Sequence, residues 1–403
     1  MTQTFKVGHL PSITWNRLHL NEVSVETALS GNLPGSRYLS LPQGASVRTL
    51  SFAQALAELE KTAPVQEQEK YVAGKAPVYH PQKFGTGLGA DYEQAMQDAG
   101  VPVEWIEIGP AEQEQTITCR MTLQDGESAS CAQILHVGEN AQVTALYVSE
   151  SAEDAAGVLA LSVRVVLEKG ASLKLALVQL LGSGFTALSD VGLSAADGAG
   201  AELIQMELGA DRSYVGVQPE LIGKEASFDS AMGYLANGEQ RLDINYNAVQ
   251  RGRQTRCAMT FDGVLGDRAQ KVFRGTIDFR NGSSGSKGEE QENVLLLSND
   301  VENRTMPVIL CEEEDVEGSH GATIGRLDEQ VLFYLATRGI DAAEAQKMMV
   351  RARLGAVARR IPDEAARRRA QDYIDRKVNC DTCVRAADCP QAWNEKGSTG
   401  EKS

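Results

Sequence analysis

Short runs of alternating apolar and polar residues fill residues 106–311 of the chain. This period of two is typical of β-strands, because successive side chains of a strand point to opposite faces. The clearest runs are residues 116–123, 142–148, 159–167, 172–181, 202–208 and 241–248. No helical pattern of about 10–15 residues separates them, which argues against alternating strand and helix units. The region is therefore predicted to be mainly β.

A weak repeat marks the corners between these runs. Gly138, Gly170 and Gly198 each stand in a short polar segment before a strand run, at intervals of roughly 30 residues. That interval fits either two strands or one coil. Short strands, polar corners and a repeat together favour a solenoid of stacked strands modestly over a β-sandwich.

The period becomes helical after residue 326. Asp328 and Asp341 are expected to cap two helices, and Pro362 begins a third. Residues 1–105 are expected to be helical or irregular, with one helix capped by Asp91 and ended by Gly100. The predicted organisation is an N-terminal helical or irregular region (1–105), a strand core (106–326), a C-terminal helical domain (327–378) and a cysteine-containing flexible tail (379–403).

Composition narrows the class of protein. The chain has 403 residues, of which 42% are hydrophobic, which is ample for a core. A formal charge of -16 argues against a nucleic-acid binder and against an anionic membrane surface. No apolar run reaches the roughly 20 residues that span a bilayer, and residues 1–7 lack the layout of a signal peptide. A cytoplasmic protein is expected.

The C-terminal helices hold the most basic stretch of this acidic chain. A solvated helix face and a docking surface for an acidic partner are both consistent with it. The arginines are Arg351, Arg353, Arg359, Arg360, Arg367, Arg368 and Arg369.

One histidine stands apart from the other four. His320 lies in Gly318-Ser319-His320-Gly321-Ala322-Thr323, where small residues allow a backbone or a partner to approach the ring. A capped turn, in which the ring only bonds its own backbone, is the plain alternative.

The cysteines fall into two groups. Cys380, Cys383 and Cys389 have metal-like spacing without a fourth local ligand, so metal binding, a disulfide and inert thiols all stay open. The other four, which lie in strand-like segments, are expected to be small buried apolar residues. They are Cys119, Cys131, Cys257 and Cys311. The chain contains no nucleophile elbow, Walker A loop or His-Glu-x-x-His motif.

Residues 271–340 resemble the C-terminal part of the SufB/SufD family of iron–sulfur cluster assembly scaffolds, and the Ser-His-Gly-Ala-Thr form is most like SufD. The matching residues are Phe273-Arg274-Gly275, Gly285-Ser286-Lys287-Gly288, Leu295-Leu296-Leu297-Ser298, Met306-Pro307, Ser319-His320-Gly321-Ala322-Thr323, Gly325-Arg326, Phe333-Tyr334-Leu335 and Arg338-Gly339-Ile340.

The resemblance implies a right-handed parallel β-helix for the strand core, flanked by helical regions. It implies a non-catalytic SufD-like scaffold that pairs with a SufB-like subunit and a SufC-type ABC ATPase. A transient Fe–S cluster would be shared with the SufB-like partner, a flavin is a further candidate cofactor, and the chain has no nucleotide site of its own. His320, with Ser319 and Thr323, would lie at the interfacial cluster-assembly site, with His320 as a ligand or proton-handling group. The C-terminal helices would dock the ATPase, and their candidate contacts are Phe333, Tyr334, Arg338, Met348 and Met349.

This chain departs from the family pattern at two positions. Gly318 stands where many relatives have a cysteine, and the position that aligns with the cluster-building cysteine of SufB lies near Val301. A SufB-like partner is therefore expected to be needed. Two alternatives are a homodimeric SufB/SufD-like scaffold and a β-helix carbohydrate-active enzyme of the polysaccharide lyase type. The enzyme would require acidic and basic side chains clustered along one strand face.

Overall fold

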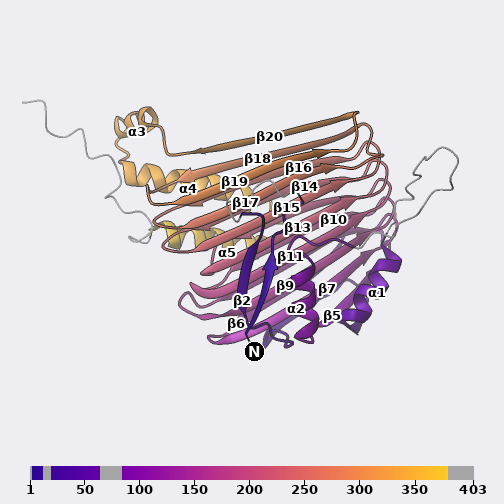
Figure 1. Cartoon of the computed structure of the whole chain (residues 1–403). Coiled ribbons are helices and arrows are strands. Elements are labelled where there is room, and N and C mark those ends of the chain that lie inside the picture. Colours follow the sequence, from indigo (N-terminus) through magenta and orange to yellow (C-terminus); the bar gives the residue numbers. More distant parts are fainter. Residues whose placement is uncertain (1, 12–19, 64–83, 380–403) are drawn as a thin grey trace, which may run out of the picture.

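The computed structural model describes residues 2–11, 20–63 and 84–379, which form a parallel β-solenoid of two facing nine-stranded sheets (Figure 1). One sheet contains, in spatial order, β3 (Ser36–Ser40), β6 (Gln115–Leu123), β8 (Gln142–Ser151), β10 (Ser172–Leu180), β12 (Gly200–Glu207), β14 (Ser227–Ala236), β16 (Arg256–Leu265), β18 (Ser286–Leu296) and β20 (Val316–Gly325). The facing sheet contains β4 (Ser46–Ser51), β5 (Pro102–Ile108), β7 (Glu127–Val137), β9 (Ala156–Leu167), β11 (Gly184–Ala195), β13 (Arg212–Leu221), β15 (Arg241–Gln250), β17 (Gln270–Phe279) and β19 (Glu302–Cys311).

Each coil of the solenoid contributes one strand to each sheet. Ser172 of β10 pairs with Gln142 of β8 on one side and with Gly200 of β12 on the other. The weak repeat seen in the sequence therefore corresponds to one full coil of two strands. Gly170 and Gly198 turn the corners before β10 and β12 with φ of 67° and 64°, a conformation that favours glycine.

The first coil has a different pairing from the others. β3 and β4 run antiparallel to β6 and β5, whereas the later pairs within both sheets are parallel. These two strands close the start of the solenoid.

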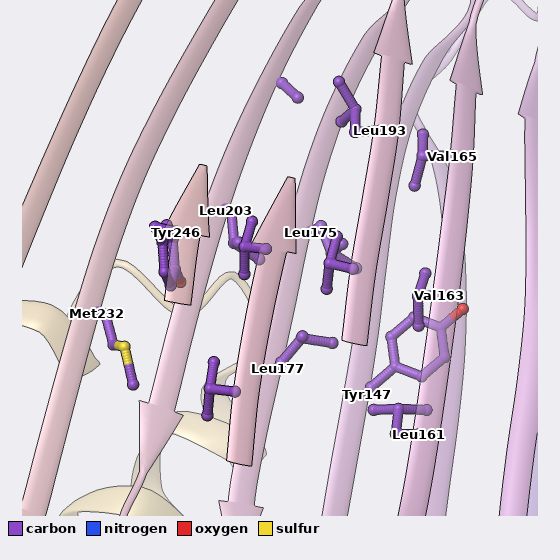
Figure 2. Close-up of a cluster of buried hydrophobic side chains, with 14 of the residues drawn as sticks. Tyr147, Leu161, Val163, Val165, Leu175, Leu177, Leu193, Leu203, Met232 and Tyr246 are labelled. Carbon is purple, nitrogen blue, oxygen red and sulfur yellow. The ribbon is translucent and has the colours of Figure 1, made fainter. Parts of the chain in front are cut away.

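Side chains that point inward from the two sheets form the core. In β6 the inward residues are Ile117, Cys119 and Met121, which are fully buried. Leu175 and Leu203 are register partners on neighbouring strands, and Figure 2 shows them at one level of the core. Such ladders repeat along the solenoid, and each fully buried leucine contributes about 1.5–3 kcal/mol relative to an exposed one.

The N-terminal region covers the outer face of the β4–β19 sheet. It contains the antiparallel pair β1 (Gln3–Val7) and β2 (Val23–Thr27), and helices α1 (Phe52–Thr62) and α2 (Ala90–Asp98). Phe52, Leu88 and Tyr92 pack there against Trp105 and Ile134. The cap predicted at Asp91 is wrong: Gly89, with φ of 90°, is the N-cap, and Asp91 lies within the first turn.

The C-terminal helices cover the outer face of the other sheet. Val350 and Leu354 of α4 (Ala342–Ala358) and Tyr373 of α5 (Glu364–Asn379) pack on strand residues that include Ile204 and Met206. Helix α3 (Glu329–Ala336) has no buried residue and projects beside the β20 end of the solenoid (Figure 1). Each sheet is thus covered on both faces, by the facing sheet on its inner face and by helices on its outer face, as is typical of parallel sheets.

The six predicted strand runs are confirmed as β6, β8, β9, β10, β12 and β15. Both helix caps predicted in the C-terminal part are also confirmed. Asp328 accepts a hydrogen bond from the Gln330 backbone N–H at 2.6 Å, and Asp341 accepts one from Glu344 at 2.8 Å. Strands β1 to β4 were not expected in a region predicted to be helical or irregular. No helix among the described residues is long and apolar enough to cross a membrane.

Candidate functional site at the open end of the solenoid

The last coil differs from the earlier ones because no further strand pairs with it in the part of the chain that the structure describes. β20 is the outermost strand of one sheet and β19 of the other. None of the ten residues of β20 is buried, whereas ten of the twelve residues of β11 are. The inward side chains of this coil therefore face an open end.

His320 is one of these inward side chains. It pairs in register with Glu290 of β18, whose side chain is buried in the core, and register partners in parallel strands point to the same face. A Cβ built on Gly318, two residues earlier, would approach Phe279 and Ile309 of the facing sheet at 3.0 and 3.2 Å. His320 therefore lies over the end of the core with its ring exposed.

The strand geometry separates the three residues predicted to form the cluster site. Because side chains alternate along a strand, Ser319 and Thr323 point to the opposite face of β20 from His320. All three are exposed. Gly321 occupies the same face of β20 as Ser319. A Cβ at this position would lie 2.5 Å from the side-chain oxygen of Gln291, so a larger residue would clash with that side chain.

A buried ion-pair network lies one layer below the open end. The Lys271 ammonium group contacts the Glu292 carboxylate, and both side chains are almost fully buried. Glu292 also accepts hydrogen bonds from the Tyr234 hydroxyl at 3.0 Å and from the Thr305 hydroxyl at 2.7 Å. Burial lowers the pKa of Lys271, while the charge of Glu292 opposes that shift. The negative charge of the buried Glu292 carboxylate is thus balanced by the Lys271 ammonium group and stabilised by two hydroxyl donors.

Glu290, two residues away in the same strand, feels the charge of Lys271, which lowers its pKa, but it forms no ion pair with it. It is 2% exposed, and its Oε2 atom has no hydrogen-bond partner. A Cβ on Gly275 would lie 2.0 Å from this atom, so the glycine makes room for the carboxyl group. Burial, and then the negative charge of Glu292, raise the pKa of Glu290 to about 8.

Sequence reasoning did not select Glu290, Glu292 or Lys271. One signal was present: Glu290 and Glu292 occupy alternate positions of the run that ends in Val294 and Leu295, so they share the inward face. Two carboxyl groups on the inward face of a strand are unusual, because isolated buried charges are strongly disfavoured.

Cys311 was expected to be buried, and this prediction is wrong. Cys311 is the last residue of β19 and pairs in register with the buried Phe279. It is nevertheless exposed, because no later strand among the described residues covers it. Cys119, Cys131 and Cys257 are buried, as expected.

The predicted docking residues of the C-terminal helices lie in two environments. Phe333 and Tyr334 of α3 are 67% and 56% exposed, and the Arg338 guanidinium lies 5.3 Å from the centre of the Tyr334 ring. Met348 of α4 is 44% exposed, whereas Met349 is partly buried against the core between the helices and the sheet.

Several arginines of this region bind acidic groups of the same chain. Arg351 contacts Asp375 at 2.6 Å, and Arg360 contacts Glu202 of β12 at 3.0 Å. Part of the basic face therefore holds the helices together and holds them to the sheet.

No group of three or more His, Cys, Asp or Glu side chains within the described ranges could hold a metal ion. The cysteine set of Cys380, Cys383 and Cys389 lies outside the described residues. A metal at the open end could therefore take only one or two ligands from the described part of this chain.

Comparisons with known proteins identify the family of this chain. Residues 120–353 match the family model described as SUF system FeS cluster assembly, SufBD core domain. The iron–sulfur cluster assembly protein SufD of Bacillus subtilis is 29% identical over 158 residues, which cover 39% of this chain and 36% of that protein. SufD of Escherichia coli is 30% identical over 115 residues, which cover 28% of this chain and 27% of that protein.

A chloroplastic SufBD family protein of Arabidopsis thaliana is 23% identical over 204 residues, 49% of this chain and 37% of that protein. The chain thus spans between 27% and 37% of the length of these relatives. The family model covers more than half of the chain and includes the open end with His320. The chain belongs to the SufB/SufD family of the SUF iron–sulfur cluster assembly system, and it is most like SufD.

Proposed function

We propose that this chain is a SufD-like scaffold subunit that pairs, through the open end of its solenoid, with a SufB-like subunit. The single observation that carries the proposal is the exposure of the last coil. A sheet that ends in an uncovered strand presents unpaired backbone groups and is a template for pairing with another chain. Here both sheets end in this way, with β20 as the last strand of one sheet and β19 as the last strand of the facing sheet.

His320 would lie at the centre of this interface. The residue is exposed and faces inward on the outermost strand, so an approaching subunit that covers this end of the solenoid would contact it. A neutral imidazole is a suitable ligand for iron, and it can also accept or donate a proton near neutral pH. In this proposal, the iron–sulfur cluster is cargo that is assembled between the two subunits.

The C-terminal helices would dock a SufC-type ATPase. Helix α3 buries none of its residues in this chain, although it carries two exposed aromatic side chains, Phe333 and Tyr334. Exposed aromatic residues beside an arginine are typical of protein interfaces. The ATPase would supply nucleotide hydrolysis, and this chain would supply surface and ligands without catalysing a reaction.

Co-expression with SufB-like and SufC-type subunits tests the pairing. We expect a stable complex of this chain with both subunits. Charged substitution at the open end, Ile324→Lys, should prevent pairing with the SufB-like subunit, while Phe333→Asp should release only the ATPase. A stable dimer of this chain alone that excludes the SufB-like subunit would instead support the homodimeric scaffold.

The role of His320 is tested separately from assembly. We expect His320→Ala to form the complex normally and to mature fewer clusters on an acceptor protein. His136→Gln is the matched control, because His136 lies on β7 near the other end of the solenoid and contacts Glu107 and Glu168. Equal maturation by wild type and His320→Ala would exclude the interfacial role of the histidine.

A further inference from the structure

Cys119 and Cys131 form a pair of buried thiols near the closed end of the solenoid, away from His320. Cys119 lies four residues before the end of β6, and Cys131 lies four residues after the start of β7. The two strands belong to facing sheets and follow each other around one corner, so both inward side chains reach the core at the same level. The two thiols hydrogen-bond each other.

Polar side chains surround this pair. The Arg37 guanidinium, on the closing strand β3, donates a hydrogen bond to the sulfur of Cys119 and another to the Glu104 carboxylate at 2.9 Å. The Gln133 amide donates to Glu104 at 2.6 Å and accepts from the Tyr147 hydroxyl at 2.5 Å. Tyr147, which Figure 2 labels, is the register neighbour of Cys119 on β8. The thiols therefore lie in a connected polar cluster within an apolar core.

This environment makes the two sulfur atoms chemically different. The hydrogen bond from Cys131, and then the Arg37 guanidinium, lower the pKa of Cys119 to about 7, although burial and the charge of Glu104 oppose the shift. The hydrogen bond to Cys119, together with burial, raises the pKa of Cys131 well above its ordinary value. Near neutral pH the pair therefore contains a thiolate nucleophile in contact with a thiol.

The polar cluster reaches the protein surface at Arg37 and Glu104. Their side chains are 10% and 15% exposed, whereas both cysteines are fully buried. Hydrogen peroxide is close to water in size and in hydrogen-bonding capacity, so it has only to pass these two side chains to reach the sulfur atoms. A protein or another bulky oxidant is excluded by the same burial.

We propose that Cys119 and Cys131 are a site of reversible oxidation, at which hydrogen peroxide closes a disulfide between the two sheets. The Cys119 thiolate attacks one oxygen of the peroxide, so an S–O bond forms as the O–O bond breaks, and the released hydroxide takes up a proton to become water. The Cys131 thiol then attacks the sulfur of this sulfenic acid. An S–S bond replaces the S–O bond, and a second water leaves. Two electrons pass from the two thiols to the peroxide.

The disulfide would cross-link the first two strands of the parallel stack. It would close a loop around the 11 residues 120–130, which form the corner between β6 and β7 and the strand segments beside it. Such a cross-link restricts the unfolded chain, so the oxidised protein should unfold at a higher denaturant concentration. The site lies at the opposite end of the solenoid from His320, so this inference is independent of the proposed function.

Oxidation of the folded, full-length chain tests the site. The protein is treated with one equivalent of hydrogen peroxide, quenched with acid, blocked with N-ethylmaleimide and digested with trypsin. Cleavage after Arg120 separates the two cysteines, so a pair of linked peptides in the mass spectrum identifies the disulfide. We expect this link to form and dithiothreitol to remove it.

Two other cysteines of the same chain are internal controls. Cys257 is buried in β16, and it should stay reduced. Oxidation of Cys257 as fast as the pair would assign the link to unfolded chains and overturn the proposal. Cys311 is exposed and reports that the oxidant is active. If Cys119 and Cys131 stay reduced while Cys311 is oxidised, they are inert core side chains and the proposal is wrong.

The variant Cys131→Ser identifies the nucleophile. It removes the thiol that resolves the sulfenic acid, so Cys119 should accumulate as a sulfenic acid that dimedone labels. Two buried thiols with only a packing role would give no label. Absence of the label in a variant that keeps the denaturation midpoint of the reduced wild type would overturn the role of Cys119.

The pH dependence of cross-linking gives a second readout. The titratable groups that face Cys119 are Arg37, Glu104, Cys131 and Tyr147. The pKa of Glu104 is lowered and those of the other three are raised, so Cys119 alone ionises near pH 7. The rate should rise about tenfold between pH 6 and pH 8 and then level off. A rise of about a hundredfold without a plateau, as for a thiol with an ordinary pKa, would overturn the activation of Cys119.

Discussion

The middle coils and the last coil of the solenoid are built from strands of similar length, yet they present different surfaces. β11 lies between β9 and β13 and is covered on its outer face, so ten of its twelve residues are buried. β20 has a strand on one side only, and none of its residues is buried. In a stacked fold, the position in the stack determines whether an inward side chain is core or surface.

The two ends of the solenoid are also unlike each other. The first coil is closed by antiparallel strands β3 and β4, which interrupt the parallel stacking. The last coil keeps the parallel register up to its final strand, so it could accept another strand. Among the described residues, only the last coil therefore ends in parallel strands to which a further parallel strand could be added.

The largest effect on stability is expected from breaking the ion pair between Lys271 and Glu292. This pair is buried just below the exposed last coil. Lys271→Met should lower the free energy of unfolding by about 3–5 kcal/mol, because it leaves a buried carboxylate without its counter-charge. Urea denaturation of the purified chain measures this loss. The double variant Lys271→Met with Glu292→Gln should recover most of it, and a double variant as unstable as the single one would contradict the explanation.

Truncation of one apolar side chain in each environment tests the comparison directly. Leu203→Ala in the middle of the core should destabilise the chain by about 2–5 kcal/mol through lost burial and a cavity. Ile324→Ala in β20 should change stability by less than about 0.5 kcal/mol, because the side chain is 43% exposed. The same urea titration serves both variants. Similar losses at the two sites would show that the end of the solenoid is covered in solution, for example by self-association.

Glu207, which is buried in the middle of the solenoid, should make the stability of the chain depend on pH. Burial raises the pKa of Glu207 to about 7, above its ordinary value of 4.5. The folded state then binds one more proton than the unfolded state between these values, so stability is greatest below pH 4.5 with respect to this group and falls as pH rises through 7. Glu207→Gln should therefore gain about 1–3 kcal/mol relative to wild type between pH 5 and pH 8.

Thermal unfolding at both pH values measures this difference. Ala57→Glu, which adds a carboxyl group to the exposed surface of α1, is the control and should show no comparable trend. A wild type and a Glu207→Gln variant with parallel pH profiles would show that Glu207 titrates normally in the fold.

The smallest effects are expected at the two helix caps beside the open end. Asp341→Ala should cost about 1 kcal/mol, because α4 packs on the sheet and its cap contributes to global stability. Asp328→Ala should leave global unfolding unchanged and increase amide hydrogen exchange within α3, since that helix buries nothing. Global destabilisation by Asp328→Ala would mean that α3 packs on the body of the protein in solution.

The sequence by itself determined where part of the strand core lies, and it left open whether the repeat of roughly 30 residues spans two strands or one coil. Alternation of apolar and polar residues located six strands of the solenoid, and the short side chains of Asp328 and Asp341 marked two helix starts, because both signals are local. The family resemblance rests on local signals as well, since the motif around His320 is a run of consecutive residues. Strands β1 to β4 escaped detection, because short strands without a clear alternation carry little local signal.

Only the tertiary structure decided what each position does. Alternation cannot show which face of β20 is inward, so the separation of His320 from Ser319 and Thr323 follows from its register with β18. Cys311 looks like a core residue in sequence and is exposed because its strand ends the stack. The burial of Glu290 beneath His320 depends on Gly275, which is 15 residues away in the chain and belongs to the facing sheet. These properties arise from pairing and stacking between distant segments, which no local pattern records.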